Sequence, residues 1–112
     1  MDTKVDKTKR IRELNDTLRR TFTGGRVLLT SGVDALPPDM KANVILAVRS
    51  FNAFDNNNDP HQEHDFCAFE VAGEKYFAKI DYYSPDMQGG SEDPSDPEKT
   101  ARVLTIMFAS EY

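Results

Sequence analysis

The fold is decided by the stretch Arg102-Val103-Leu104-Thr105-Ile106-Met107-Phe108-Ala109, near the end of the chain. Every residue in this stretch except Arg102 and Thr105 is apolar. A short run of this kind predicts a strand that is buried on both faces, which is typical of the interior of a sheet. We therefore expect it at the centre of the sheet, with the other elements arranged around it.

The chain before this strand predicts a β-hairpin. Residues 66–71 and 76–83 are rich in aromatic side chains, and Ala72-Gly73-Glu74 between them fits a short turn. Side chains alternate between the two faces of a strand, which gives one face Phe77, Lys79, Asp81 and Tyr83, and the other Tyr76, Ala78, Ile80 and Tyr82. The pattern leaves open which face is buried, although Lys79 and Asp81 indicate that theirs is partly wet.

The first third of the chain predicts a helix and a strand. In residues 5–22 the apolar side chains recur at spacings of three and four, and Gly24-Gly25 supplies a stop; these side chains are Ile11, Leu14, Leu18 and Phe22. The basic residues of this helix fall mostly on its other faces, as a solvated surface or a docking surface. Residues 26–31 predict a strand, which residues 31–34 break.

A second helix is expected to begin at Pro37-Pro38, because proline is tolerated in the first turn and Asp39 favours a helix N-terminus. It is expected to end near residues 52–54. Its predicted buried stripe consists of Met40, Val44, Ala47, Val48 and Phe51, widened by Ile45 and Leu46.

The element order is therefore helix, strand, helix, strand, strand, strand. It predicts an α+β fold with a mainly antiparallel sheet of about four strands and two helices packed on one face. The length of 112 residues suits a single domain over 1–112, with a frayed N-terminus at 1–8 and a long acidic connection at 84–100.

Charge is distributed unevenly along the chain. Residues 1–26 carry eight Lys and Arg against four Asp and Glu, or +4, and residues 27–112 carry six against fifteen, or −9, which together give the net charge of −5. An acidic body repels nucleic-acid phosphates, so we expect no direct nucleic-acid binding. It suits the basic surface of another protein instead, although surplus acid also serves solubility alone.

Cysteine usage and hydropathy indicate the compartment. The single cysteine, Cys67, excludes an internal disulfide framework, and no apolar run is long enough to span a bilayer. The charged N-terminus shows no secretory signal. We expect a cytoplasmic protein without membrane contact, in which Cys67 is a small buried thiol of an apolar strand.

The polar segment at 55–65 contains both histidines of the chain. Asp55, Asn57 and Asp59 match the opening of an EF-hand loop, but Pro60 and Phe66 stand where the loop needs Gly and Glu. A looser divalent-ion site at this cluster is one alternative. A transition-metal site is another, with His61, His64, Asp65 and Asp81 as its ligands. A nuclease hairpin fits poorly, because Lys79 precedes Asp81. An ordinary polar turn explains the segment as well.

Several strings resemble a known family: residues 11–16, 21–27, 58–60, 63–66, 79–83, 90–94 and 102–107, with 109–112 at the end. They are similar to a family of short alphaproteobacterial proteins that carries only a domain-of-unknown-function label. The resemblance extends from about Ile11 to Tyr112 and implies a setting on plasmids and other mobile elements, near anti-restriction genes. It implies no catalytic residue and no substrate.

We therefore expect a small acidic, non-enzymatic interaction protein without a cofactor. Its partner would be a host protein with a basic, nucleic-acid-binding surface, as for a counter-defence inhibitor of the anti-CRISPR or anti-restriction type. The expected contact residues are Asp55, Asp59, Glu63, Asp65, Tyr82, Tyr83, Asp86, Glu92, Asp93, Asp96 and Glu98. The alternatives are a metal-binding protein or metal-dependent hydrolase centred on His61, His64, Asp65 and Asp81, and a homodimer in which the basic first helix docks on a second acidic body.

Overall fold

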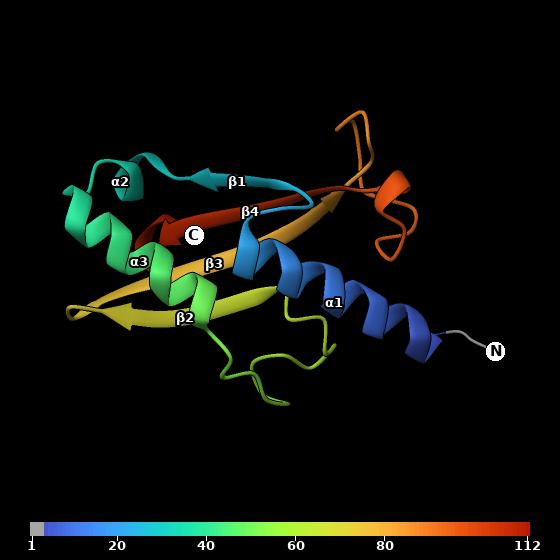
Figure 1. The fold of residues 1–112 in the computed structure, drawn as a ribbon, viewed down its shortest axis with the longest axis horizontal. Coiled ribbons are helices and arrows are strands. Elements are labelled where there is room, and N and C mark those ends of the chain that lie inside the picture. The colour runs from blue at the N-terminus through green and yellow to red at the C-terminus, as the bar shows by residue number, and fades with distance from the viewer. Residues whose placement is uncertain (1–3) are drawn as a thin grey trace.

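Two long helices lie on one face of a four-stranded sheet (Figure 1). The structure is a computed structural model that describes residues 4–112, with side chains from residue 6 onward. The helices are α1 (Lys4–Thr21) and α3 (Pro38–Ser50). Of the N-terminal residues expected to fray, 4–8 form the first turns of α1, and 1–3 lie outside the described residues. The expected α+β fold is confirmed.

The sheet has the order β1-β4-β3-β2. Its strands are β1 (Arg26–Leu29), β2 (Phe66–Val71), β3 (Glu74–Tyr83) and β4 (Ala101–Phe108). The β2–β3 and β3–β4 pairs are antiparallel, as expected, whereas β1 runs parallel to β4. The predicted central position of the apolar strand is confirmed, because β4 has a neighbour on each side and side chains on both its faces are buried.

The turn of the β2–β3 hairpin consists of two residues. Ala72 and Gly73 have φ angles of 52° and 83°, both in the left-handed region. Two consecutive positive φ angles match the right-handed twist of the flanking strands. This tight turn fixes the register Val71↔Glu74, and it thereby places Tyr76, Ala78 and Ile80 on the face that the helices cover.

The first long helix packs through a stripe that is only partly apolar. Ile11 and Leu18 are buried, and so are Asn15 and Arg19 on the same side of the helix. After Thr21 the chain turns back at Phe22, whose φ is 60° and whose N–H donates to the Leu18 carbonyl at 2.8 Å.

The segment between β1 and α3 departs from the expectation. Residues 31–34, predicted as a break, form the one-turn helix α2 (Ser31–Asp34), because the Thr30 hydroxyl accepts a hydrogen bond from the Val33 N–H. In α3, Val44 and Val48 are fully buried, but the prediction for Leu46 is wrong, since it is 64% exposed. Leu46 lies on the solvent side of α3, because only one side of the helix faces the sheet.

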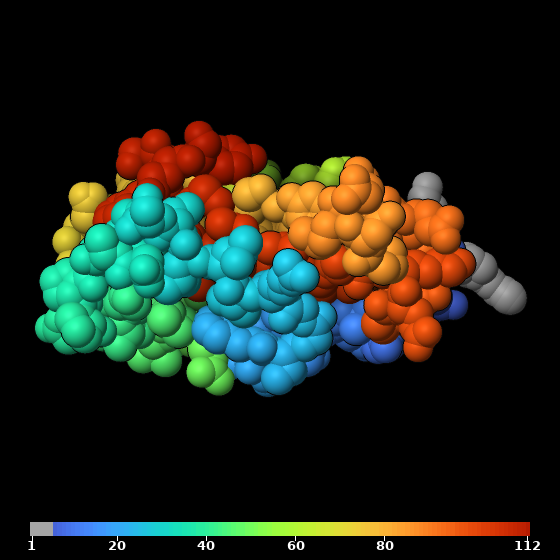
Figure 2. Space-filling view, turned by 90° about the horizontal axis from the view of Figure 1, so that it is seen from above, coloured from blue at the N-terminus to red at the C-terminus, as the bar shows by residue number. Residues whose placement is uncertain are grey.

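The core lies between the helices and the inner face of the sheet. It joins Leu18 and Val44 from the helices to Ile80, Leu104 and Ile106 from the strands. The molecule viewed from above has the helical segments along one side and the C-terminal residues on the other (Figure 2). The outer face of the sheet therefore has no helix on it among residues 4–112 apart from the C-terminal turn η2 (Ala109–Glu111). No helix in this part of the chain is long and apolar enough to cross a membrane.

Candidate functional site

A buried polar network joins α1 to the sheet and to both polar loops. Asn15 and Arg102 are 0% and 3% exposed, and the Arg102 Nε donates to the Asn15 Oδ1 at 2.6 Å. The Asn15 amide donates to the Glu63 carbonyl at 2.9 Å and to the Tyr82 hydroxyl at 2.8 Å. Tyr82 donates in turn to the Glu63 carboxylate at 2.7 Å. Both polar atoms of the Asn15 side chain are thus hydrogen-bonded inside the protein, Oδ1 as an acceptor and Nδ2 as a donor to two partners.

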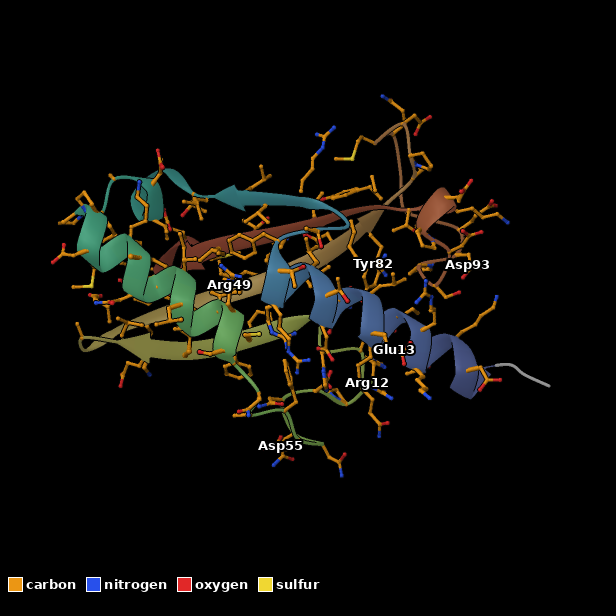
Figure 3. All side chains as sticks on the ribbon, viewed as in Figure 1. Arg12, Glu13, Arg49, Asp55, Tyr82 and Asp93 are labelled. Atoms are coloured by element: carbon orange, nitrogen blue, oxygen red, sulfur yellow. The ribbon has the colours of Figure 1, made fainter. Side chains whose placement is uncertain are left out.

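The same network reaches the connection 84–100. The Arg102 Nη2 donates to the Pro94 carbonyl, and the guanidinium lies 5.0 Å from the centre of the Tyr82 ring. Burial lowers the pKa of Arg102. Burial and the hydrogen bond to Glu63 raise the pKa of Tyr82, so its hydroxyl stays a donor at neutral pH. One arginine therefore ties the acidic connection to the helix. Figure 3 labels Tyr82, which lies beside α1, and Asp93 of the connection.

A second polar cluster holds the segment 55–65 against α1. The His64 Nδ1 lies 2.8 Å from the Asp16 Oδ1, and its Nε2 lies 3.6 Å from the Asp59 Oδ2. The imidazole stacks on Phe54 with 3.8 Å between ring centres. Asp16 also accepts from Arg19, which is 1% exposed and whose Nε and Nη2 have no hydrogen-bond partner within residues 4–112. His64 is therefore a packed residue of this cluster.

The connection 84–100 is held in shape by its own carboxylates. Asp86 accepts from the Ser84 hydroxyl at 2.6 Å and from the Gln88 N–H at 3.0 Å. Asp93 accepts from both the N–H and the hydroxyl of Ser95. These hydrogen bonds lower the pKa of both carboxyl groups.

A carboxylate also holds the end of the connection in shape. Asp96 accepts from the Glu98 N–H at 2.9 Å and so caps the short helix η1 (Pro97–Lys99). The Lys7 ammonium lies 3.5 Å from the Asp93 carboxylate, which links the connection to the start of α1. Glu92 and Glu98 remain exposed and border a hollow of about 290 Å³.

The expected contact residues thus fall into three groups. Asp59, Glu63, Asp65 and Tyr82 are buried or half-buried, and burial together with the charge of Glu63 raises the pKa of Asp65. The carboxylates of Asp55, Asp86, Asp93 and Asp96 accept hydrogen bonds from their own loops. Glu92 and Glu98 are exposed, and Tyr83 lies half-buried on the outer face of the sheet.

The four residues of the expected metal site do not converge. His61 is exposed, and His64 is engaged by Asp16 and Asp59. Asp81 lies on the outer face of the sheet, where its carboxylate is 2.6 Å from the Lys79 ammonium. Within residues 4–112, no three His, Cys, Asp or Glu side chains are placed to hold one metal ion.

Comparison with known families identifies the family of this chain. A family described as proteins of unknown function, DUF3768, matches residues 29–111, which is more than half of the chain. The chain belongs to the DUF3768 family. This confirms the resemblance to a family defined by a domain of unknown function. No curated protein and no solved structure shows a significant match. The DUF3768 match begins at the last residue of β1, so it includes Glu63, Tyr82 and Arg102, while Asn15 lies outside it.

A pocket of about 280 Å³ lies beside the segment 55–65 of this DUF3768 protein. It is lined by Arg12, Phe54, Asp55, Asn56, Asp59, Gln62 and His64. Gln62 and His64 have φ angles of 60° and 55°, and Arg12 donates to the Gln62 carbonyl at 2.9 Å. The lining combines a guanidinium, an imidazole and two carboxylates, so it favours no single class of ligand.

Sequence reasoning did not identify Asn15, Arg19 and Arg102 as site residues of the DUF3768 protein. One signal was available, because Asn15 follows Ile11 by four positions and precedes Leu18 by three, and therefore lies on the apolar side of the helix. A polar residue there needs a partner when it is buried. The partner, Arg102, is distant in sequence and could not be read from local spacing.

Proposed function

We propose that this protein is a non-enzymatic interaction protein that binds a basic surface of another protein through the connection 84–100. The observation that carries the proposal is the ordered state of this connection. The carboxylates of Asp86, Asp93 and Asp96 accept hydrogen bonds from within the connection. Arg102 and Lys7 bind it to the rest of the protein. A loop that is already ordered loses less conformational entropy when it binds.

Glu92 and Glu98 are the residues that such a connection offers to a partner. They border the hollow together with Lys99, whose ammonium lies 3.7 Å from the Glu92 carboxylate. The Glu92 and Lys99 side chains are 77% and 51% exposed, so this pair is weak and can be exchanged for a partner's arginine or lysine. Complementary charge would raise the association rate and select basic partners.

The finer proposal concerns the class of partner. Basic surfaces built to hold nucleic acid are the ones that clustered carboxylates match best, because both phosphates and carboxylates are bound by arginine and lysine. We propose that the protein occupies such a surface on a host protein in the cytoplasm, as a counter-defence inhibitor carried by alphaproteobacterial mobile elements. No cofactor and no catalytic residue is needed for this role.

The test compares two charge reversals of equal size. Glu92→Lys with Glu98→Lys alters the connection, and Glu13→Lys with Glu74→Lys alters exposed positions on α1 and at the hairpin turn. Asp93→Lys would be a poor choice, because Asp93 organises the connection itself. All forms are immobilised and incubated with a lysate of the source cells, and bound proteins are eluted with salt.

We expect the wild type and the E13K/E74K control to retain the same protein, and the E92K/E98K variant to lose it while keeping its thermal transition. Retention of that protein by all three forms would contradict the assignment of the contact to Glu92 and Glu98. Retention of none would contradict the interaction function itself.

A further inference from the structure

The outer face of β3 carries a self-complementary row of side chains. Phe77, Lys79, Asp81 and Tyr83 follow one another at every second position, so that the row reads aromatic, positive, negative, aromatic. In the opposite direction the row reads aromatic, negative, positive, aromatic. Two copies of the row that run in opposite directions therefore place each charge opposite a charge of the other sign, and each aromatic residue opposite an aromatic residue. This face is the one that α1 and α3 leave uncovered.

The two charged groups lie at the middle of this row. The Lys79 ammonium is 2.6 Å from the Asp81 carboxylate, and the side chains are 32% and 36% exposed. Each charged side chain therefore has one ionic partner on its own strand, and about a third of its surface remains accessible to solvent. Their neighbours across the ladder on β4 are Thr105 and Val103, which bear no charge that would compete for them.

Apolar and aromatic surface surrounds the pair. The Tyr112 ring packs against Phe66 and Phe77, with 6.1 and 5.5 Å between ring centres, and it is 76% exposed. A hollow of about 390 Å³ lies next to Phe77, and its lining combines Ala68 and aromatic side chains with the charged Glu70 and Lys75. Leu28 on β1 is also half exposed. Aromatic side chains around a small polar centre are the composition that protein interfaces favour.

We propose that a second copy of this chain packs on the outer face of the sheet. The two copies are related by a two-fold axis that lies between the facing sheets, at right angles to β3, and passes over the strand midway between Lys79 and Asp81. A two-fold axis at right angles to the strands reverses the strand direction in the second copy. It places Lys79 opposite the partner's Asp81, and Phe77 opposite the partner's Tyr83. An isologous contact requires this kind of self-complementarity, in which the first residue meets the second and the second meets the first.

This dimer rests on the sheet face and is independent of the contact proposed for Glu92 and Glu98. It also differs from a dimer held by the basic side of α1, because the charged residues involved lie on opposite faces of the molecule. The two arrangements can therefore be separated by substitution.

The test uses two variants that are each self-repelling and mutually complementary. Lys79→Asp gives two carboxylates at the centre of the row, and Asp81→Lys gives two ammonium groups. Analytical ultracentrifugation over a concentration series measures the dimer dissociation constant of the wild type, of each variant and of their equimolar mixture. Circular dichroism checks the fold, and Lys9→Glu with Arg10→Glu on exposed positions of α1 is the control.

We expect the wild type and the α1 control to dimerise, each single variant to dimerise at least about tenfold more weakly, and the mixture to recover the wild-type dissociation constant. A wild type that stays monomeric over the whole series would overturn the proposal without any variant. So would a dimer that the α1 substitutions abolish and the two β3 substitutions leave intact.

Discussion

The Asn15 amide oxygen accepts a hydrogen bond from the Arg102 guanidinium at 2.6 Å, although 87 residues separate the two in the chain. This contact joins the helix at the start of the protein to the central strand of the sheet. Through the other hydrogen bonds of the same two residues it also fixes Glu63 in one polar loop and Pro94 in the other. One buried pair therefore helps to position both loops.

Replacing Asn15 by alanine should destabilise the protein strongly. The change would leave the Arg102 Nε and the Glu63 carbonyl without their partner in a buried environment, at a cost of about 3 kcal/mol in the free energy of unfolding. Urea denaturation measures this loss. Asn43→Ala in α3, at an exposed position, is the matched control and should leave stability nearly unchanged. Equal stability of the two variants would show that the network contributes nothing.

Gly25 is required by the close approach of the chain to β4. A Cβ atom at this position would lie 2.5 Å from the Arg102 carbonyl oxygen and 3.0 Å from a methyl carbon of Leu18. Gly25→Ala should therefore lower the free energy of unfolding by about 1–3 kcal/mol through backbone displacement. Gly89→Ala is the control, since nothing lies within 4 Å of its Cβ position. A thermal midpoint for Gly25→Ala equal to that of Gly89→Ala would contradict the packing described.

Glu111 should make stability depend on pH in the acid range. Hydrogen bonds from the Thr30 hydroxyl and the Phe108 N–H lower its pKa below the ordinary value of 4.5. The folded state thus favours the ionised form, and this stability is present above the unfolded pKa and is lost as pH falls through the folded pKa. Glu111→Gln should be less stable than the wild type at neutral pH. The difference should vanish in acid, and a difference that grows on acidification would refute the assignment.

Cys67 should be unreactive in the folded protein. It is buried in β2, and this burial raises the pKa of its thiol to about 12. Only the thiolate attacks alkylating reagents, so the cysteine should react with iodoacetamide only in molecules that unfold, at a rate that urea raises. Mass spectrometry with and without urea measures this rate. Rapid labelling under native conditions would place Cys67 at the surface.

The sequence was sufficient for the elements whose environment is encoded locally. The apolar run in β4 indicated a strand with two buried faces, and the alternation in β3 separated Tyr76 from Phe77 correctly. The parallel direction of β1 could not be predicted, because its four residues do not show which strand of the sheet they pair with. α2 was missed because its capping depends on one hydroxyl of Thr30.

The candidate site was predictable only in part for a related reason. Local spacing marked the polar segment and the acidic connection, and the structure contains both as ordered loops. Local spacing could not show that the side chains of Glu63 and Tyr82 face inward. Their orientation depends on hydrogen bonds to Asn15 and on Arg102, which come from opposite ends of the chain. Buried polar pairs of this kind follow from tertiary packing, and a single sequence does not contain that information.

The most direct measurement is a calorimetric titration of the captured partner with the wild-type protein and with the E92K/E98K variant, at low and at moderate salt. Recognition by the exposed carboxylates of the connection predicts a dissociation constant that rises with salt and is about a hundredfold larger for the variant. Nucleic acid added to the partner should compete with the wild type. An unchanged dissociation constant for the variant, at either salt concentration, would contradict recognition through Glu92 and Glu98.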